Sequence, residues 1–178
     1  MSEFSESYHL RGTSRRDAAD LLARAGLAGF VFPALDGWVT LVAEGEPFVP
    51  NKKLIKANTG TLLRWMCGDD QGWGFDVFNR RRRECRYFCL WEEALAIEGR
   101  VTHAQLSEAL GMQLIGLAGR AGRQILYPES VDQVAQVKPA YAFAQAVGLT
   151  HYRWLAFDYL QSDVSRGRPL PPGVLRVE

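Results

Sequence analysis

The first part of the chain contains a short β-rich run followed by a stretch with helical spacing. Residues 7–13, SYHLRGT, have the composition of a β-strand. Ser14 then offers an N-cap, and the apolar residues after it recur at three- and four-residue intervals. Gly26 follows the last of them, and glycine often ends a helix. The pattern therefore predicts a strand and then a helix over residues 14–26.

Two pairs of β-rich runs predict two hairpins. The first pair, residues 28–35 and 37–45, is joined through an Asp-Gly dipeptide, which favours a tight turn. The second pair, residues 73–78 and 84–92, encloses a run of consecutive arginines. The arginines then occupy the tip of the second hairpin.

The segment between the two hairpins, residues 54–68, is expected to be helical in its second part. Leu62, Leu63 and Met66 share one helical face. Gly68 can end such a helix, while the Asn-Thr-Gly sequence before Leu62 can break its first turn. We therefore expect one helix between the hairpins.

From about residue 100 the pattern becomes helical. Thr102 and Ser130 each begin a capping box, the arrangement that satisfies the free amides of a helix N-terminus. Residues 150–162 fit either a helix face or an aromatic strand, and the length of the segment favours the helix.

Together these elements predict an α+β fold. We expect an antiparallel sheet meander with helices on one face, in the order β-α-β-β-α-β-β, followed by a helical C-terminal lobe. The expected limits are residues 1–98 for the sheet lobe and 99–163 for the helical lobe, packed as one unit. Residues 164–178 are expected to be a proline-rich tail, too rich in Pro and Gly for helix or strand. Removing the tail from Ser165 onward is therefore expected to leave the core folded.

The amino-acid composition limits the functional classes to which the protein can belong. The chain has 178 residues, of which 47% are hydrophobic and 23% are charged, so it can bury a core without disulfides or metal. The net charge of +1 lacks the basic excess that nucleic-acid-binding domains usually carry. Only a local cluster of positive charge can support such a role.

The expected setting is a bacterial cytoplasm. Arginine greatly outnumbers lysine, and Ala, Leu and Gly are abundant, which is typical of a GC-rich bacterial genome. The N-terminal sequence MSEFSESYHL has no secretory signal. The longest uncharged stretch, residues 25–35, is too short to span a bilayer and contains Pro33. We expect no membrane partner.

The cysteines and histidines indicate neither a metal site nor a disulfide. If residues 84–91 form a strand, Cys85 and Cys89 lie on one face about 13 Å apart. That separation is too large for a disulfide or a shared zinc ion, so we expect reduced, buried thiols. The histidines have no metal-ligand or catalytic spacing, so we assign no catalytic residue, no metal and no cofactor. The residues considered are Cys67, Cys85, Cys89, His9, His103 and His151.

The arginine run is the one concentrated positive charge in the sequence. It consists of Arg80, Arg81, Arg82 and Arg83, with Arg86 nearby. Flanking aromatic residues resemble the stacking platforms of single-strand binders, but they are more simply explained as core residues of two strands. The acidic residues considered as internal partners of the arginines are Asp69, Asp70, Glu92 and Glu93.

Three functional hypotheses follow. The first is a small non-catalytic protein, monomeric or homodimeric, that binds a protein partner, with the arginines as a solubilising tip or a docking point for an acidic surface. The second is a nucleic-acid-binding protein that uses the Arg80–Arg83 hairpin. The third is an enzyme whose site is assembled from residues scattered in the sequence.

Overall fold

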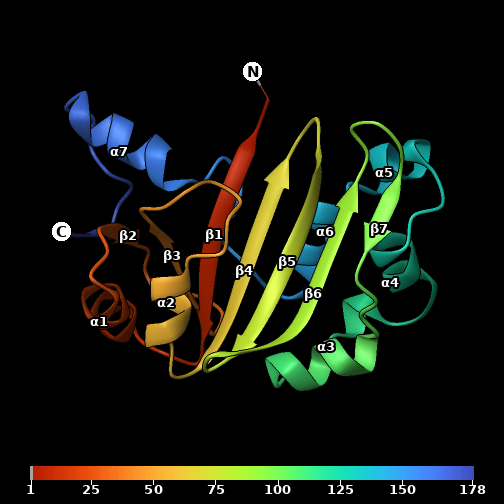
Figure 1. Ribbon diagram of the computed structural model, residues 1–178, viewed down its shortest axis with the longest axis horizontal. Coiled ribbons are helices and arrows are strands. Elements are labelled where there is room, and N and C mark those ends of the chain that lie inside the picture. Colours follow the sequence, from red (N-terminus) through yellow and green to blue (C-terminus); the bar gives the residue numbers. More distant parts are fainter. Residues whose placement is uncertain (1) are drawn as a thin grey trace.

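A computed structural model describes residues 2–178 and shows an α+β fold built on one eight-stranded antiparallel sheet (Figure 1). The strand order across the sheet is β7-β6-β5-β4-β1-β3-β2-β8. The strands are β1 (Phe4–Arg11), β2 (Gly29–Val31), β3 (Trp38–Ala43), β4 (Thr61–Gly68), β5 (Gly72–Asn79), β6 (Arg82–Leu90), β7 (Ala96–Glu98) and β8 (Leu175–Val177).

The helices divide into an N-terminal pair and a C-terminal group. They are α1 (Arg15–Ala25), α2 (Lys52–Ala57), α3 (His103–Leu110), α4 (Gly119–Leu126), α5 (Val131–Val137), α6 (Pro139–Ala146) and α7 (Phe157–Ser165), with a 3-10 turn η1 (Ile115–Leu117). The predicted fold class, an antiparallel meander followed by a helical C-terminal lobe, is confirmed.

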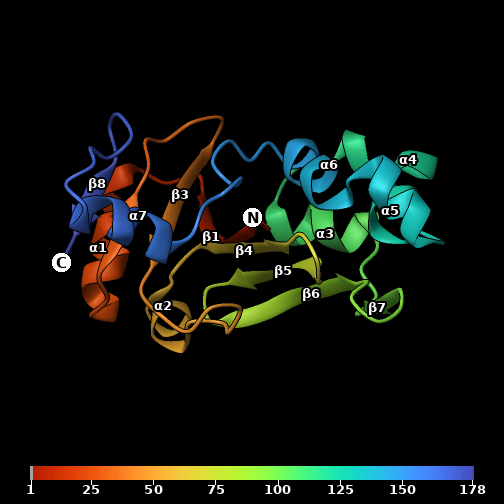
Figure 2. The same ribbon diagram turned by 90° about the horizontal axis from the view of Figure 1, so that it is seen from above.

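The two groups of helices cover opposite faces of the sheet (Figure 2). On one face, α1 and α2 pack against β1, β3 and the adjoining part of β4. On the other face, α3 to α6 pack against β4, β5 and β6, where Phe75 of β5 stacks on Phe143 of α6 with ring centroids 4.4 Å apart. The main core therefore joins residues from the sheet lobe with residues from the helical lobe.

The local signals at the start of the chain are confirmed. Ser14 and Asp17 form a capping box at the N-terminus of α1, and Gly26 ends the helix in the left-handed conformation with φ of 62°. Asp36 and Gly37 both have positive φ at the turn between β2 and β3. These features depend on neighbours in sequence, which is why the pattern alone finds them.

The helix expected in the second part of residues 54–68 is wrong. The helix α2 comes earlier and ends before Asn58, and Thr61–Gly68 form strand β4. Every residue of β4 after Thr61 is buried. A strand covered on both faces carries a continuous apolar run instead of an alternating one, so its periodicity can imitate a helix.

The segment 150–162 is helical only in its second half. Its first half lies against β1 beyond the end of β3, where the backbone amide of Glu6 donates to the carbonyl of Leu155 at 2.8 Å. The Leu155 amide donates in turn to Ser5 Oγ at 3.0 Å, and Trp154 adopts a positive φ of 50°. These long-range hydrogen bonds hold the backbone out of a helix until Phe157.

A stripe of polar side chains on β1 lies beneath this segment. Ser5, Ser7 and His9 alternate along the strand and Glu3 lies just before it, and each of the four side chains is 0% exposed. Ser7 Oγ lies 2.9 Å from His9 Nε2, and His9 Nδ1 lies 3.0 Å from the hydroxyl of Thr40. Both ring nitrogens of His9 therefore have neutral hydrogen-bonding partners, and no carboxylate within residues 2–178 forms an ion pair with the ring.

The tail does not match its expected character. Leu175–Val177 form β8, which pairs with β2 at the edge of the sheet, and Arg15 donates a hydrogen bond to the carbonyl of Gly173. Leu170 and Val174 pack against the apolar cluster around Phe30. Tertiary contacts thus order a Pro- and Gly-rich segment that has no periodic signal of its own.

Truncation after Ser165 should therefore destabilise the protein. The loss of β8 and of the half-buried side chains of Leu170, Val174 and Val177 should lower the free energy of unfolding by about 2 kcal/mol, since full burial of one such side chain contributes about 1.5–3 kcal/mol. Urea titrations of the full and truncated chains measure this difference. Equal midpoints and slopes would show that the tail packing contributes nothing.

Acid should destabilise the fold through His9. Burial lowers the pKa of His9 from 6.5 to about 3. Between these values the unfolded chain binds a proton that the folded chain does not, so the free energy of unfolding should fall as pH falls, by at most about 1.4 kcal/mol per pH unit. Urea titrations between pH 6.5 and 4.5 should show a shallower dependence for His9→Gln. Parallel pH profiles for the two proteins would contradict this assignment.

Candidate functional site: the arginine hairpin and its polar network

The arginine run lies at the tip of the β5–β6 hairpin, as expected. Arg80 and Arg81 form the turn, and Arg82 and Arg83 begin β6. All four side chains are exposed, as is that of Arg86 further along the strand. Arg80 has a positive φ of 55°, a left-handed conformation that favours glycine.

A buried asparagine holds the tip in place. Asn58, at the end of α2, is 2% exposed, and its side-chain amide donates to the carbonyls of Gly60 and Arg80 at 2.9 and 2.7 Å. The Arg80 amide donates to the same Gly60 carbonyl at 2.8 Å. The backbone of the turn is therefore fastened to the α2–β4 connection, and only the arginine side chains extend into solvent.

The internal partners of the arginines differ from those expected. Arg82 pairs with Glu84 on the same strand at 2.8 Å, and Arg83 approaches Asp76 on β5 at 3.7 Å. No ion pair joins the run to the expected acidic residues anywhere in residues 2–178. Those residues are Asp69, Asp70, Glu92 and Glu93. Asp69 and Asp70 belong to the turn at the other end of β5 (Figure 1).

The aromatic residues around the run belong mostly to the core. Trp73, Phe75 and Tyr87 are at most 1% exposed and pack against the C-terminal helices. They cannot stack on nucleic-acid bases. Phe88 and Trp91 are partly exposed, and the guanidinium of Arg86 lies 4.8 Å from the centre of the Phe88 ring.

A β-bulge brings Arg83 to the same face as Asp76. Val77 pairs with Cys85, but the next residue, Phe78, pairs with Arg83, so Glu84 is an extra residue in β6. Strict alternation from the inward-facing Cys85 would point Arg83 toward the C-terminal helices. The bulge reverses its direction and lets it reach the carboxylate of Asp76.

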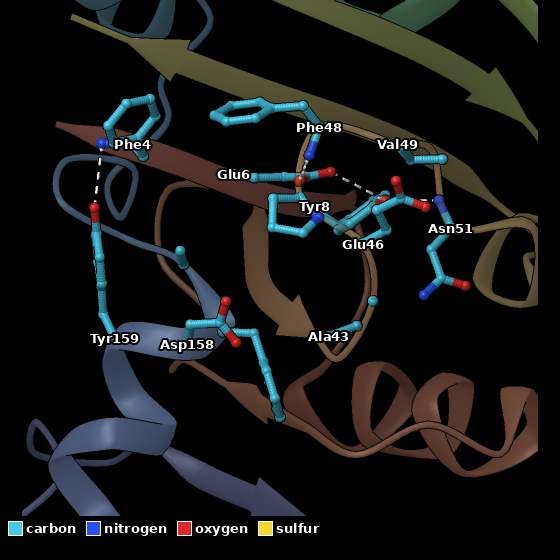
Figure 3. A pocket seen from close by; sticks show the side chains of 14 residues that line it. Phe4, Glu6, Tyr8, Ala43, Glu46, Phe48, Val49, Asn51, Asp158 and Tyr159 are labelled. Carbon is cyan, nitrogen blue, oxygen red and sulfur yellow. Dashed lines mark hydrogen bonds between the residues drawn. The ribbon is translucent and has the colours of Figure 1, made fainter.

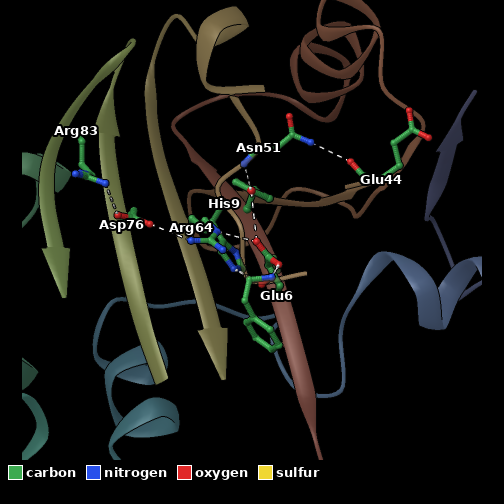
Figure 4. A network of polar contacts seen from close by, with 10 residues as sticks. Glu6, His9, Glu44, Asn51, Arg64, Asp76 and Arg83 are labelled. Atoms are coloured by element: carbon green, nitrogen blue, oxygen red, sulfur yellow. Dashed lines mark hydrogen bonds and ion pairs between the residues drawn. The ribbon is translucent and has the colours of Figure 1, made fainter. Parts of the chain in front are cut away.

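A row of side chains with alternating positive and negative charge begins at Arg83 and crosses four adjacent strands (Figure 4). Asp76 of β5 accepts from Arg64 of β4 at 3.1 Å, and Arg64 Nε donates to Glu6 of β1 at 2.7 Å. The order Glu6, Arg64, Asp76, Arg83 places two carboxylates and two guanidiniums in a neutral row. Sequence patterning missed this row, because its members lie on four different segments.

The centre of the row is fully buried. The side chains of Arg64 and Asp76 are each 0% exposed. Burial by itself lowers the pKa of Arg64, but Glu6, Tyr8 and Asp76 outweigh it and raise the pKa above the ordinary value, so Arg64 remains charged. Among the residues that the structure describes, Arg64 Nη2 and Asp76 Oδ1 have no hydrogen-bond partner. Each of these two buried charges is therefore strongly stabilised by its ion pair with the other.

Ser7 and His9 form a serine–histidine pair of the kind used in nucleophilic catalysis, but neither side chain is accessible to a substrate. Both side chains are 0% exposed, so neither reaches solvent. Burial also raises the pKa of each cysteine thiol, that of Cys67 to about 12. All three cysteines are free and buried, which confirms the prediction of unpaired core thiols.

Neither a metal-binding cluster nor a membrane-spanning helix is present in residues 2–178. No group of three or more His, Cys, Asp or Glu side chains within this range is placed to hold a metal ion. No helix in the same range has the length and apolar character needed to cross a membrane.

Comparison with known proteins adds no further evidence. The chain matches no family model, no curated protein and no solved structure. Inference about function therefore rests on the geometry of this molecule.

Removing the charge of Arg64 should strongly destabilise the protein. Arg64→Met leaves Asp76 buried without its partner, and breaking a buried ion pair in this way typically costs about 3–5 kcal/mol. The double variant Arg64→Met/Asp76→Asn should recover part of the loss, because the remaining group is no longer charged. Urea titration measures both effects.

Arg82→Met is the matched control, since it removes an exposed arginine from an ion pair on the same hairpin. Its unfolding midpoint should equal that of the wild type. If Arg64→Met also unfolded at the wild-type midpoint, the row of charges would not stabilise the sheet.

Proposed function

We propose that this is a small non-catalytic binding protein that docks an acidic surface of a partner protein through the tip of the β5–β6 hairpin. The cytoplasm of a bacterium is the proposed setting, and the protein acts as a monomer or homodimer. The observation that carries the proposal is the conformation of Arg80. Its positive φ of 55° costs a residue other than glycine about 1–2 kcal/mol, yet the side chain is exposed and forms no ion pair within residues 2–178.

The position of Arg80 favours a binding role over a solubilising one. Any charged residue at a neighbouring, unstrained position would keep the tip soluble, and glycine at position 80 would fit the turn better. Backbone strain at an exposed position supports a functional hypothesis when the local structure holds it in place. Here Asn58 provides that restraint through its hydrogen bond to the Arg80 carbonyl.

The charge distribution favours an acidic partner. Arg80 and Arg81 have no acidic neighbour within ion-pair distance in the described chain, while Arg82 and Arg83 are partly neutralised by Glu84 and Asp76. A shallow depression lies at the tip, where the first three arginines outnumber the single carboxylate of Glu84. The rest of its lining is Asn58, Thr59 and Asn79. Because the turn is fastened to α2, little backbone order has to be gained on binding, and preorganisation of this kind increases affinity.

Nucleic acid is the second candidate for the same surface. The Arg86–Phe88 pair, with the guanidinium 4.8 Å from the ring centre, supports it, since such a pair can extend a basic surface with a stacking group. Burial of Trp73, Phe75 and Tyr87 favours the protein partner, because it leaves too few aromatic rings to stack successive bases.

A binding assay with two probes distinguishes these candidates. Immobilised protein is titrated with a peptide rich in Glu and Asp and with an oligo-dT single strand, at about 50 mM and about 200 mM salt. Stronger retention of the peptide, with affinity falling in the variant Arg80→Ser/Arg81→Ser/Arg82→Ser, supports the proposal. The variant should melt at the wild-type temperature, since all three side chains are exposed.

The matched control is Arg100→Ser/Arg120→Ser/Arg123→Ser, which removes the same charge from exposed positions in the helical lobe. It should bind both probes as the wild type does. Equal losses in the two triple variants would mean that only overall charge matters. Tighter binding of the oligonucleotide, lost in the hairpin variant alone, would favour the nucleic-acid hypothesis.

A further inference from the structure

A small cleft lies between β1, the loop that joins β3 to α2, and the first turn of α7 (Figure 3). Its volume is about 110 Å³. This is room for a group of a few heavy atoms, because a water molecule occupies about 30 Å³ in the liquid. Tyr159 and Asp158 approach it from α7, and Glu46 and Phe48 approach it from the loop.

The charged groups of the cleft are all acidic. Glu6, Glu46 and Asp158 line it, and its lining contains no Lys, Arg or His. Arg64, on the adjacent strand β4, neutralises Glu6. Glu46 and Asp158 form no ion pair anywhere in the described residues. The cleft therefore carries an uncompensated negative charge.

Aromatic rings form much of the remaining wall. Phe4 and Phe48 meet edge to face with ring centroids 6.1 Å apart, and Tyr8, Phe157 and Tyr159 complete the aromatic lining. The faces of aromatic rings attract cations, an effect that is strongest where the cation leaves water. Negative charge and aromatic faces in one cleft favour the same class of ligand.

The wall is held in position before any ligand binds. Phe48 has a positive φ of 60°, which is strained for an aromatic residue, and its amide donates to Glu6 Oε2 at 2.7 Å. The amide of Asn51 donates to the Tyr8 hydroxyl at 3.0 Å. The amide of Phe4 donates to the Tyr159 hydroxyl at 3.2 Å, so β1, the loop and α7 are tied together around the cleft.

We propose that this cleft binds a small organic cation, an alkylammonium or guanidinium head group, between its aromatic walls and the carboxylates of Glu46 and Asp158. An anion is disfavoured by those carboxylates, although the cleft lies at the N-terminal end of α7, because Asp158 already places a negative charge in the first turn of that helix. A neutral apolar group would form no favourable electrostatic interaction with the carboxylates of Glu46 and Asp158. The site is independent of the arginine hairpin and of the function proposed for it.

Titration with n-butylammonium, followed through the backbone amide resonances of the full chain, tests the proposal. At about 150 mM salt, where exposed charges are screened beyond about 8 Å, saturable shifts are expected at Phe48 and Tyr159. The neutral analogue 1-butanol should bind at least tenfold more weakly. Equal binding of the amine and the alcohol, or shifts that do not saturate, would refute a cation site.

Variants locate the site. Glu46→Gln/Asp158→Asn should weaken n-butylammonium binding at least tenfold, and Phe48→Leu should weaken it several-fold while leaving the wall apolar. Asp20→Asn/Glu129→Gln removes the same charge from exposed positions outside the cleft lining and should bind as the wild type does. Equal losses in the two double variants would overturn the assignment. Unchanged melting temperatures show that each variant remains folded.

A final comparison identifies the source of the head group. If a free amine binds as tightly as a lysine within a short neutral peptide, the natural ligand is a small molecule, which is the source we propose. Tighter binding of the peptide would assign the cleft to a side chain of another protein and overturn that part of the proposal. Failure of the arginine hairpin to bind an acidic peptide would leave both results unaffected.

Discussion

The ion pairs that Arg64 makes with strands on both sides of it constrain much of this structure. Arg64 lies on the central strand β4, which is buried on both faces, so its charge has to be matched within the sheet. Glu6 on β1 and Asp76 on β5 supply the match. A shift of either neighbouring strand by one residue would turn its carboxylate to the opposite face and leave Arg64 unpaired.

The same pairing connects two surface features that lie far apart in the sequence. At one end of the row, Asp76 faces Arg83, which reaches it because of the bulge at Glu84. At the other end, Glu6 uses its second oxygen to hold the Phe48 amide and thereby the loop that forms the cleft. A buried ion pair contributes little net stability compared with apolar packing, but leaving one of its charges unpaired is costly, so these pairs favour the observed strand register. The row of charges thereby also positions Arg83 of the arginine hairpin and the loop that forms the cleft.

The two faces of strand β1 lie in different environments. Its Glu6 side faces the ionic row and the cleft, whereas Ser7 and His9 belong to the buried polar stripe on the other face. Burial keeps His9 neutral, and hydrogen bonds with Ser7 and Thr40 satisfy its two ring nitrogens. The segment before α7 hydrogen-bonds to β1 beyond the last residue pair of β1 and β3, so a distant part of the chain satisfies backbone groups at this end of β1.

The elements whose signals are local could be predicted from the amino-acid sequence alone. Ser14 and Gly26 bound a helix through hydrogen bonds to near neighbours, and the runs on either side of the arginines form a hairpin because aromatic and β-branched residues favour strands. The exposed tip of Arg80–Arg83 could be predicted for the same reason. Tertiary structure decided whether β4 is a strand or a helix, because a segment buried on both faces loses the alternation that distinguishes the two. The folding of the tail into β8 and the bulge at Glu84 also depend on tertiary structure, because each needs a partner strand. The same holds for the ion pairs among Glu6, Arg64 and Asp76, whose members only the folded chain brings within reach of one another.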